Sequence, residues 1–114
     1  MKYTEHNLGP MKCLAFEGDF TMDEALPLRN QKNAMWFNTQ ADLLIDLAQV
    51  AFLDSCAVGF LVDVFHSQRR QNYRFGFCGL QPQAEAVLDL VGLLAHTPQF
   101  ETRHHALDTW QKKP

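Results

Sequence analysis

The sequence lacks the features of two large functional classes. Its 114 residues contain no basic cluster longer than Arg69-Arg70 and Lys112-Lys113, and the formal net charge is −3. Binding to nucleic acid usually needs a concentrated basic surface, so that function is not expected. No apolar run is long enough to span a bilayer, because Asp89 interrupts the best one, and we expect no membrane insertion.

Cysteine is also scarce, with Cys13, Cys56 and Cys78 as its only occurrences. Each cysteine lies in or beside an apolar run, and none forms the C-x-x-C pair of zinc and redox sites. We interpret all three as small core side chains of a protein in a reducing compartment. Residues 1–6 contain no hydrophobic signal region, which also favours a cytoplasmic location.

Motifs for catalysis are missing as well. There is no glycine-rich phosphate loop, no paired-carboxylate motif and no nucleophile elbow. His104 and His105 are adjacent, so on a helix or strand they point apart and cannot chelate a metal together. The remaining histidines, His6, His66 and His96, have no companion at ligand spacing. We therefore expect no metal, no cofactor and no enzymatic activity.

The residues that are present indicate one α/β domain over residues 1–114. A hydrophobic fraction of 46% and a charged fraction of 20% are ordinary for a globular protein, and the length suffices for a core without disulfides. Strand and helix patterns alternate along the chain, and parallel neighbouring strands need such crossover helices. We predict a small mixed β-sheet with alternating helices.

The expected strands are residues 2–8, 11–18, 43–47 and 73–78, with a short edge strand at 99–102. Gly9-Pro10 joins the first two as an antiparallel pair, and apolar residues occupy both faces of the second, as in a central strand. Asp46 interrupts the third strand, so it must be hydrogen-bonded or lie at the strand's end.

The first helix is the hardest to place. Thr21-Met-Asp-Glu24 has the form of a capping box. Pro27, however, fits the first turn of a helix better than its interior. We therefore predict a turn followed by a helix over residues 26–37.

Three further helices follow from the apolar spacing. Residues 55–70 carry a stripe at Val58, Leu61, Val62 and Phe65, with Asp63, Ser67 and Gln68 outside it. Gln81-Pro82 opens the next helix, with Ala84, Val87, Leu88 and Val91 as its stripe and Gly92 at its end. Residues 105–110 form a final helical turn, and the polar tail 111–114 is expected to fray.

The turn Asp54-Ser55 joins the apolar strand to the helix at 55–70. A helix N-terminus has unpaired amides and a partial positive charge, so it tolerates an added phosphate. A negative charge there typically gains about 0.3–1 kcal/mol. Serine is also a common N-cap, and aspartate commonly bonds its own backbone in turns. Both structural roles are compatible with phosphorylation of Ser55.

The segment LLIDLAQVAFLDSCAVGFL, residues 43–61, resembles the sulfate transporter and anti-sigma factor antagonist (STAS) domain. The family pattern is an apolar strand, Asp-Leu, a short loop, and Asp-Ser-Ser-Gly-Leu-Gly at the start of a helix. Residues 16–20 (FEGDF) and 88–93 (LDLVGL) also match, in family order, and the resemblance spans about residues 10–107.

The resemblance implies a non-catalytic regulatory protein. Its partner would be a serine-kinase anti-sigma factor, which the unphosphorylated protein sequesters and which phosphorylation of Ser55 releases, with a phosphatase to restore it. ATP and magnesium would belong to the kinase. The residues implied in partner binding are Thr21, Asp54, Ser55, Cys56, Ala57 and Gly59.

Three positions depart from the family pattern. Cys56 replaces the second serine, Ala57 replaces the glycine, and Thr21 stands where many members have aspartate, whereas Gly59 matches. We expect the methyl group of Ala57 to hinder close approach of a kinase loop. The alternative is therefore an unphosphorylated STAS subunit of a larger assembly, such as a lipid transport ABC complex or a stress-signalling complex.

Overall fold

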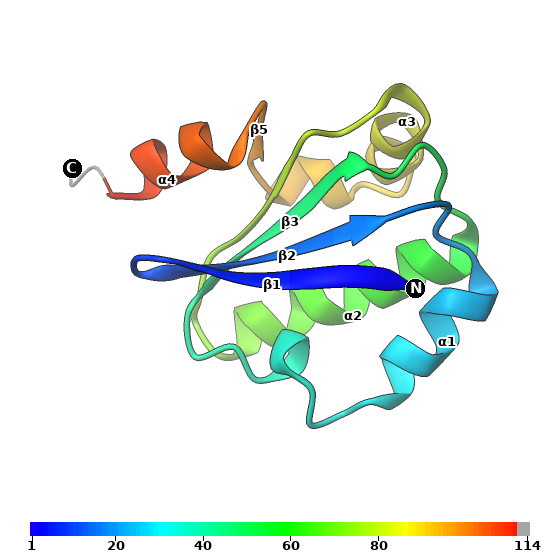
Figure 1. Cartoon of the computed structure of the whole chain (residues 1–114), viewed down its shortest axis with the longest axis horizontal. Helices are drawn as coiled ribbons and strands as arrows, with labels where there is room; N and C mark the ends of the chain where they lie inside the picture. Colours follow the sequence, from blue (N-terminus) through cyan, green and yellow to red (C-terminus); the bar gives the residue numbers. More distant parts are fainter. Residues whose placement is uncertain (112–114) are drawn as a thin grey trace.

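Five strands form one mixed sheet whose order, β1-β2-β3-β4-β5, is the order of the chain. The computed structural model describes residues 1–111. β1 pairs antiparallel with β2, and every later pair is parallel (Figure 1). The strands are β1 (Lys2–Leu8), β2 (Met11–Glu17), β3 (Asp42–Gln49), β4 (Phe75–Cys78) and β5 (Gln99–Phe100). The predicted α/β class with a mixed sheet is confirmed.

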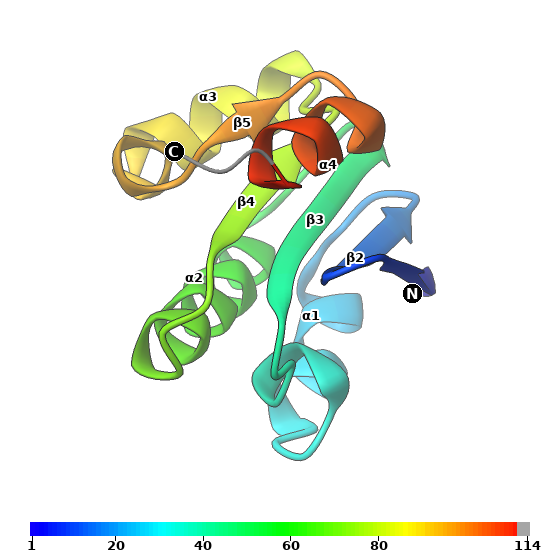
Figure 2. The ribbon, with the colours of Figure 1, turned by 90° about the vertical axis from the view of Figure 1, so that its left-hand side faces the viewer.

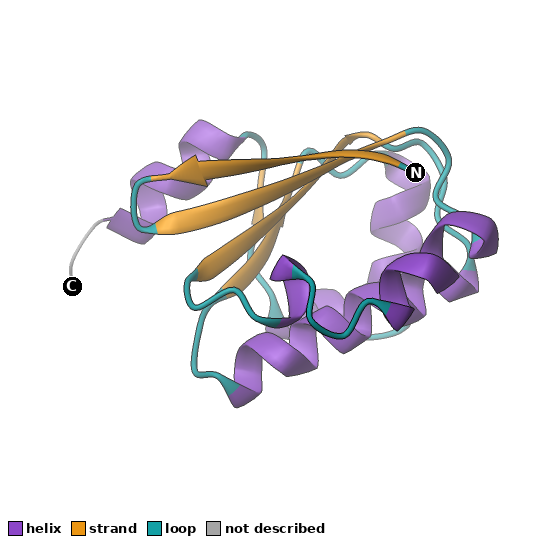
Figure 3. Ribbon diagram, turned by 60° about the horizontal axis from the view of Figure 1, so that its bottom comes forward, coloured by secondary structure: helices purple, strands orange, loops and turns teal. Residues whose placement is uncertain are grey.

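Helices cover both faces of this sheet, as Figures 2 and 3 show. The helices are α1 (Met22–Asn30), α2 (Ser55–Arg70), α3 (Pro82–Leu90) and α4 (Arg103–Gln111), with short 3₁₀ turns η1 (Met35–Phe37) and η2 (Leu93–His96). The first three pack with η1 and η2 into the larger core, and α4 covers the other face. The tail expected to fray begins at Gln111, the last residue of α4, and residues 112–114 lie outside the described residues.

β2 has an apolar side chain on each face, as predicted for a central strand. Leu14 and Phe16 belong to the larger core, whereas Met11 and Cys13 belong to the smaller core under α4. Successive side chains of a strand point to opposite faces of the sheet, so this one apolar segment contributes to two separate cores.

Phe60 of α2 lies at the centre of the larger core. Its ring centroid is 5.8 to 6.2 Å from the rings of Phe16, Phe20, Trp36 and Phe37. The pairs with Phe16, Trp36 and Phe37 are edge to face, and such pairs add to the free energy gained by apolar burial. The core-facing stripe of α2 is thus wider than predicted, since Ala57, Phe60 and Val64 are buried in it as well.

The predicted helix at residues 26–37 is wrong. α1 begins directly after Thr21 and contains Pro27, and the chain leaves it at Asn30 before η1. Pro27 has no N–H for the carbonyl oxygen of Asp23, four residues earlier. Both residues are exposed, so water can reach the carbonyl oxygen that the proline leaves free. The capping box, by contrast, is present as predicted.

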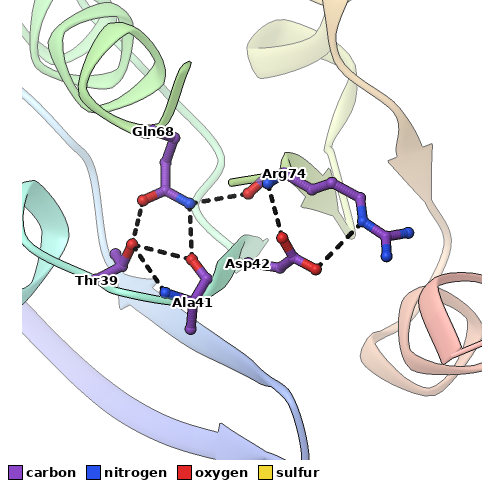
Figure 4. A network of polar contacts seen from close by, with 5 residues as sticks. All are labelled: Thr39, Ala41, Asp42, Gln68 and Arg74. Atoms are coloured by element: carbon purple, nitrogen blue, oxygen red, sulfur yellow. Dashed lines mark hydrogen bonds and ion pairs between the residues drawn. The ribbon is translucent and has the colours of Figure 1, made fainter. Parts of the chain in front are cut away.

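Ser67 and Gln68 also differ from the prediction, because both are buried. Gln68 Nε2 donates to the carbonyl oxygens of Ala41 (3.0 Å) and Arg74 (2.9 Å), and its Oε1 accepts from the Thr39 hydroxyl (Figure 4). Asp42 accepts the Arg74 N–H at 2.7 Å. This polar cluster holds the starts of β3 and β4 side by side. The Gln68 side-chain amide can be buried there because its oxygen and nitrogen both have hydrogen-bond partners.

Smaller differences occur in the C-terminal third. β4 begins at Phe75, β5 has two residues, and α4 begins at Arg103, earlier than expected. Gly92 follows α3 at φ +81°, the left-handed conformation expected of a glycine after a helix. Val91 does not join the core stripe of α3, since it is 54% exposed.

Candidate functional site

Two loops that lie far apart in the sequence form the site around Ser55. The loop after β2 pairs with the loop after β3 through a bridge between Phe20 and Leu53. The Phe20 N–H donates to the carbonyl oxygen of Phe52 at 2.9 Å, and the Asp54 N–H donates to the carbonyl oxygen of Phe20 at 3.1 Å. The N-termini of α1 and α2 are therefore neighbours at one end of the sheet (Figure 1).

Asp54 caps both of these helices. Its Oδ1 accepts the N–H of Ala57 at 2.9 Å, which caps α2. Its Oδ2 accepts the N–H of Met22, the first residue of α1, at 2.8 Å. The suggestion that Ser55 is the N-cap is thus wrong, because Asp54 holds that position and Ser55 is the first residue of the helix.

The start of α1 is stabilised a second time by the Thr21–Glu24 capping box. The Glu24 carboxylate accepts the Thr21 hydroxyl at 2.6 Å and the Thr21 N–H at 3.2 Å. The hydroxyl bond, followed by the backbone bond, lowers the pKa of Glu24 below its usual value. Thr21 therefore has an assigned structural role, and its hydroxyl is already engaged.

The residues after Asp54 differ sharply in exposure. The side chain of Ser55 is exposed, whereas Cys56 is half-buried and packs against the larger core. Ala57 is completely buried. The methyl group of Ala57 lies in the larger core, so it is not part of the exposed surface around Ser55.

Gly59 lies on the outer side of α2 beneath Arg29 of α1. A Cβ placed on Gly59 would approach Arg29 Nη1 to 3.0 Å. The same guanidinium pairs with Asp63 at 3.0 Å. The absence of a side chain at Gly59 therefore allows α1 and α2 to be joined by an ion pair across their surface.

Gln83 is a site residue that the sequence analysis missed. Its Oε1 accepts the Leu53 N–H at 2.9 Å, and its Nε2 donates to the Leu53 carbonyl oxygen at 3.0 Å. The side-chain amide thus pairs with the backbone as a neighbouring strand would. The only local feature that could have indicated a role for Gln83 is its position in the first turn of α3, directly after Pro82.

Three large apolar side chains are exposed on the two segments that meet at the Asp54 caps. Met22 is 49% exposed, Leu26 43% and Phe52 42%. Met22 and Leu26 are four residues apart, on one side of α1. Phe52 precedes the Asp54 cap by two residues. We call these three residues together with Ser55 the Ser55 surface.

The described residues contain neither a metal site nor a membrane span. Within residues 1–111, no three His, Cys, Asp or Glu side chains gather where they could hold a metal ion. No helix in that range has both the length and the apolar character needed to cross a bilayer. His104, one of the two adjacent histidines, lies 3.5 Å from the carboxylate of Asp108 on the surface of α4.

Comparison with solved structures shows the same fold in several bacterial proteins. A Thermotoga maritima protein assigned as an anti-sigma factor antagonist has a TM-score of 0.87 and 16% identity, over 96% of this chain and 95% of its own. An anti-sigma factor antagonist from Mycobacterium paratuberculosis has a TM-score of 0.83 and 22% identity, over 97% and 94%. The Bacillus cell fate determinant SpoIIAA, in its phosphorylated form, has a TM-score of 0.75 and 14% identity, over 96% and 100%.

At these identities the structural likeness shows a shared fold and no more. No relative was found among proteins of curated function. The sequence profile of the STAS domain, however, matches residues 7–106, which include both capped helices, the Asp54-Ser55 turn and the start of α4. The chain belongs to the STAS domain family.

Proposed function

We propose that this protein is an anti-sigma factor antagonist that binds a serine-kinase anti-sigma factor through the Ser55 surface. Phosphorylation of Ser55 by that partner ends the interaction. The observation that carries the proposal is the exposed hydroxyl of Ser55 at the first position of α2, framed by exposed Met22, Leu26 and Phe52. The resemblance in fold to anti-sigma factor antagonists supports it.

The surroundings of Ser55 suit a docking surface. Large exposed apolar side chains lose contact with water when a partner covers them. This burial stabilises a complex by about 25 cal/mol per Å² of apolar area. A hydroxyl on such a surface can be buried at little cost in free energy when the partner forms one hydrogen bond with it. The unphosphorylated protein therefore presents a face that binds without an unpaired charge at its centre.

A phosphate on Ser55 changes this face without disturbing the fold. It adds about −1.5 to −2 charges at neutral pH. The helix N-terminus accommodates part of that charge, but the carboxylate of Asp54, the preceding residue, adds negative charge of its own. Covering so many negative charges with an apolar partner is costly, because a buried charge without a counter-ion is strongly unfavourable. Release of the partner follows.

The direct test is incubation with the cognate kinase and ATP, followed by intact mass measurement. The chain has two serines, Ser55 and Ser67, and Ser67 is buried with its hydroxyl bonded to the Phe37 carbonyl oxygen at 2.9 Å. We expect one added phosphate on the wild type and on Ser67→Ala, and none on Ser55→Ala. An unmodified wild type in the presence of an active kinase would refute the switch.

A second function is favoured by Cys56, which stands in place of a serine and is half-buried against the core. In this alternative the protein is an unphosphorylated STAS subunit of a larger assembly, and the Ser55 surface docks permanently. Met22→Ser and Phe52→Ser would weaken partner binding under both functions. Treatment with the kinase and ATP discriminates the two functions. Under the first it releases the partner from the wild type but not from Ser55→Ala, and under the second it releases the partner from neither.

A further inference from the structure

An aromatic pocket lies at the opposite end of α2 from Ser55. The 16 residues of α2 make it about 24 Å long, so the two features are well separated. The pocket encloses about 220 Å³ between the end of α2, the start of β4 and the last turn of α4. Nothing in the proposed function uses it.

Its walls are held rigidly by packing. Phe65 and Phe75 meet edge to face at 5.9 Å and form one wall. Trp110 forms the other and is fixed edge to face against Phe100 at 5.5 Å. Gly76 permits this arrangement, since a Cβ there would approach Trp110 Cζ2 to 3.0 Å. The rings of Phe65, Phe75 and Trp110 are buried, so only a small part of each faces the pocket, and this rigid aromatic surface favours contact with a flat ring.

Two guanidinium groups border the opening. Arg69 Cζ lies 5.5 Å from the ring centroid of Phe65, and Arg74 Cζ lies 5.8 Å from that of Trp110. Each arginine is therefore held over one wall by a cation–π contact. Both residues are exposed, and the exposed Tyr73 lies between them in sequence at the rim. Arginine is the side chain best suited to bind a carboxylate with two parallel hydrogen bonds.

The local charge is positive although the whole chain is acidic. No carboxylate lines the pocket among the described residues. The side chain of Arg74 pairs with Asp42 through Nε, at 3.2 Å, from the side of the Gln68 cluster (Figure 4). The remaining guanidinium nitrogens of Arg74 extend away from that cluster, as Figure 4 shows.

We propose that this pocket binds a small planar aromatic carboxylate. The ring of the ligand contacts the exposed parts of Phe65, Phe75 and Trp110, and the carboxylate meets Arg69 and Arg74 at the rim. The volume suits a molecule of one or two rings, since sites for drug-sized ligands are usually about 300–1,000 Å³. An uncharged ring would make no ion pair with the two arginines, and a non-aromatic anion would make no aromatic contact with Phe65, Phe75 or Trp110.

The test is a titration followed by ¹H–¹⁵N correlation spectra, with 1-naphthoate as the probe. The chain has two tryptophans, and their indole N–H signals report separately. Trp36 lies in the larger core with its indole N–H bonded to the Leu28 carbonyl oxygen at 3.1 Å, so it serves as an internal control. We expect a saturable shift of the Trp110 signal and none of the Trp36 signal. Trp110→Phe assigns the two signals.

Two ligand controls and one pair of variants complete the design. 1-Naphthalenemethanol lacks the charge and cyclohexanecarboxylate lacks the aromatic ring, so both should bind at least about tenfold more weakly. Arg69→Gln should weaken 1-naphthoate binding by about tenfold. Its matched control is Arg70→Gln, at the neighbouring exposed position outside the pocket, which should leave binding unchanged.

The proposal fails if 1-naphthoate causes no saturable shift of Trp110 up to millimolar concentration. It also fails if Arg69→Gln and Arg70→Gln weaken binding equally, because the attraction would then come from general surface charge. Equal affinity for the neutral alcohol would likewise contradict a carboxylate site.

Discussion

The carboxylate of Asp54 accepts the backbone N–H of Met22 at 2.8 Å, across 32 residues of sequence. Because the same carboxylate also caps α2, one side chain fixes the first turns of two helices. The position of Ser55 relative to the exposed Met22 and Leu26 is therefore set by its immediate neighbour. A change at Asp54 should alter both the stability of the protein and the geometry of the Ser55 surface.

Asp54→Ala should lower the free energy of unfolding by about 2 kcal/mol, because removal of one N-cap typically costs about 0.5–2 kcal/mol and this residue caps two helices. Urea unfolding measures this as a lower midpoint with an unchanged slope. Asp19→Ala, at an exposed acidic position in the neighbouring loop, is the control and should change stability little. A loss no larger than that of the control would contradict the double cap.

Gly59→Ala should stabilise the protein modestly, by about 0.5 kcal/mol. Alanine gains about 1 kcal/mol over glycine inside a helix. Part of this gain is lost because the added Cβ displaces Arg29 from Asp63, and a half-exposed ion pair is worth only about 0–1 kcal/mol.

A double-mutant cycle with Arg29→Met tests the explanation for Gly59. In the Arg29→Met background, Gly59→Ala should raise the free energy of unfolding by nearly the full gain of about 1 kcal/mol that alanine has over glycine in a helix. If Gly59→Ala destabilises the protein in both backgrounds, the contact with Arg29 is not what limits the size of residue 59.

Glu24 should give the capping box a pH dependence in the acidic range. The pKa of Glu24 is lowered in the folded protein by its bonds to Thr21, so its contribution is fully present above the unfolded pKa, near 4.5. The contribution disappears as the pH falls through the lower, folded pKa.

The measurement for Glu24 is the difference in unfolding midpoint between the wild type and Glu24→Gln. The difference should be constant near neutral pH and shrink below about pH 4.5. Glu85→Gln, on the exposed side of α3, controls for the general effect of removing one negative charge. A difference that grows on acidification would have the wrong sign for this cap.

The three cysteines should differ in reactivity. Cys13 and Cys78 are almost completely buried, and burial raises the pKa of Cys13 to about 12 and that of Cys78 further. Thiols in this state are poor nucleophiles, whereas Cys56 is half-buried near the surface. Iodoacetamide at pH 8 should therefore add one group to the native protein and three to the unfolded one.

Cys56→Ser is the matched control for the alkylation experiment. This variant should remain unmodified when native and take up two groups when unfolded. Rapid labelling of native Cys56→Ser would show that one of the buried thiols becomes accessible in the folded state.

Much of this fold was predictable because its signals are local. The residues of β2 are apolar on both faces, and the apolar residues of α2 recur at helical spacing, so each element can be recognised within its own segment. The prediction of residues 26–37 failed because it gave Pro27 more weight than the capping box at Thr21. In the folded protein, an exposed second turn tolerates the proline, since water can satisfy the carbonyl oxygen that it leaves free.

The capping box was predicted, but the polar contacts of the site between distant segments were beyond local prediction. Asp54 meets Met22 across 32 residues, and Gln83 meets Leu53 across 30. Gln68 was predicted to lie outside the core stripe, yet it is completely buried, and its side chain has three hydrogen-bond partners. Which loops meet depends on the order of strands in the sheet, and no spacing within one segment carries that information.

The order of strands also has a consequence for synthesis. Each strand pairs with the one before it, so a chain emerging from the ribosome can extend the sheet without leaving a gap for a later strand. α4 follows all five strands, however, and it covers Met11, Cys13 and Leu44, which are made much earlier. Nascent chains that stall before residue 100 would expose this apolar face, and they are the species most prone to aggregate.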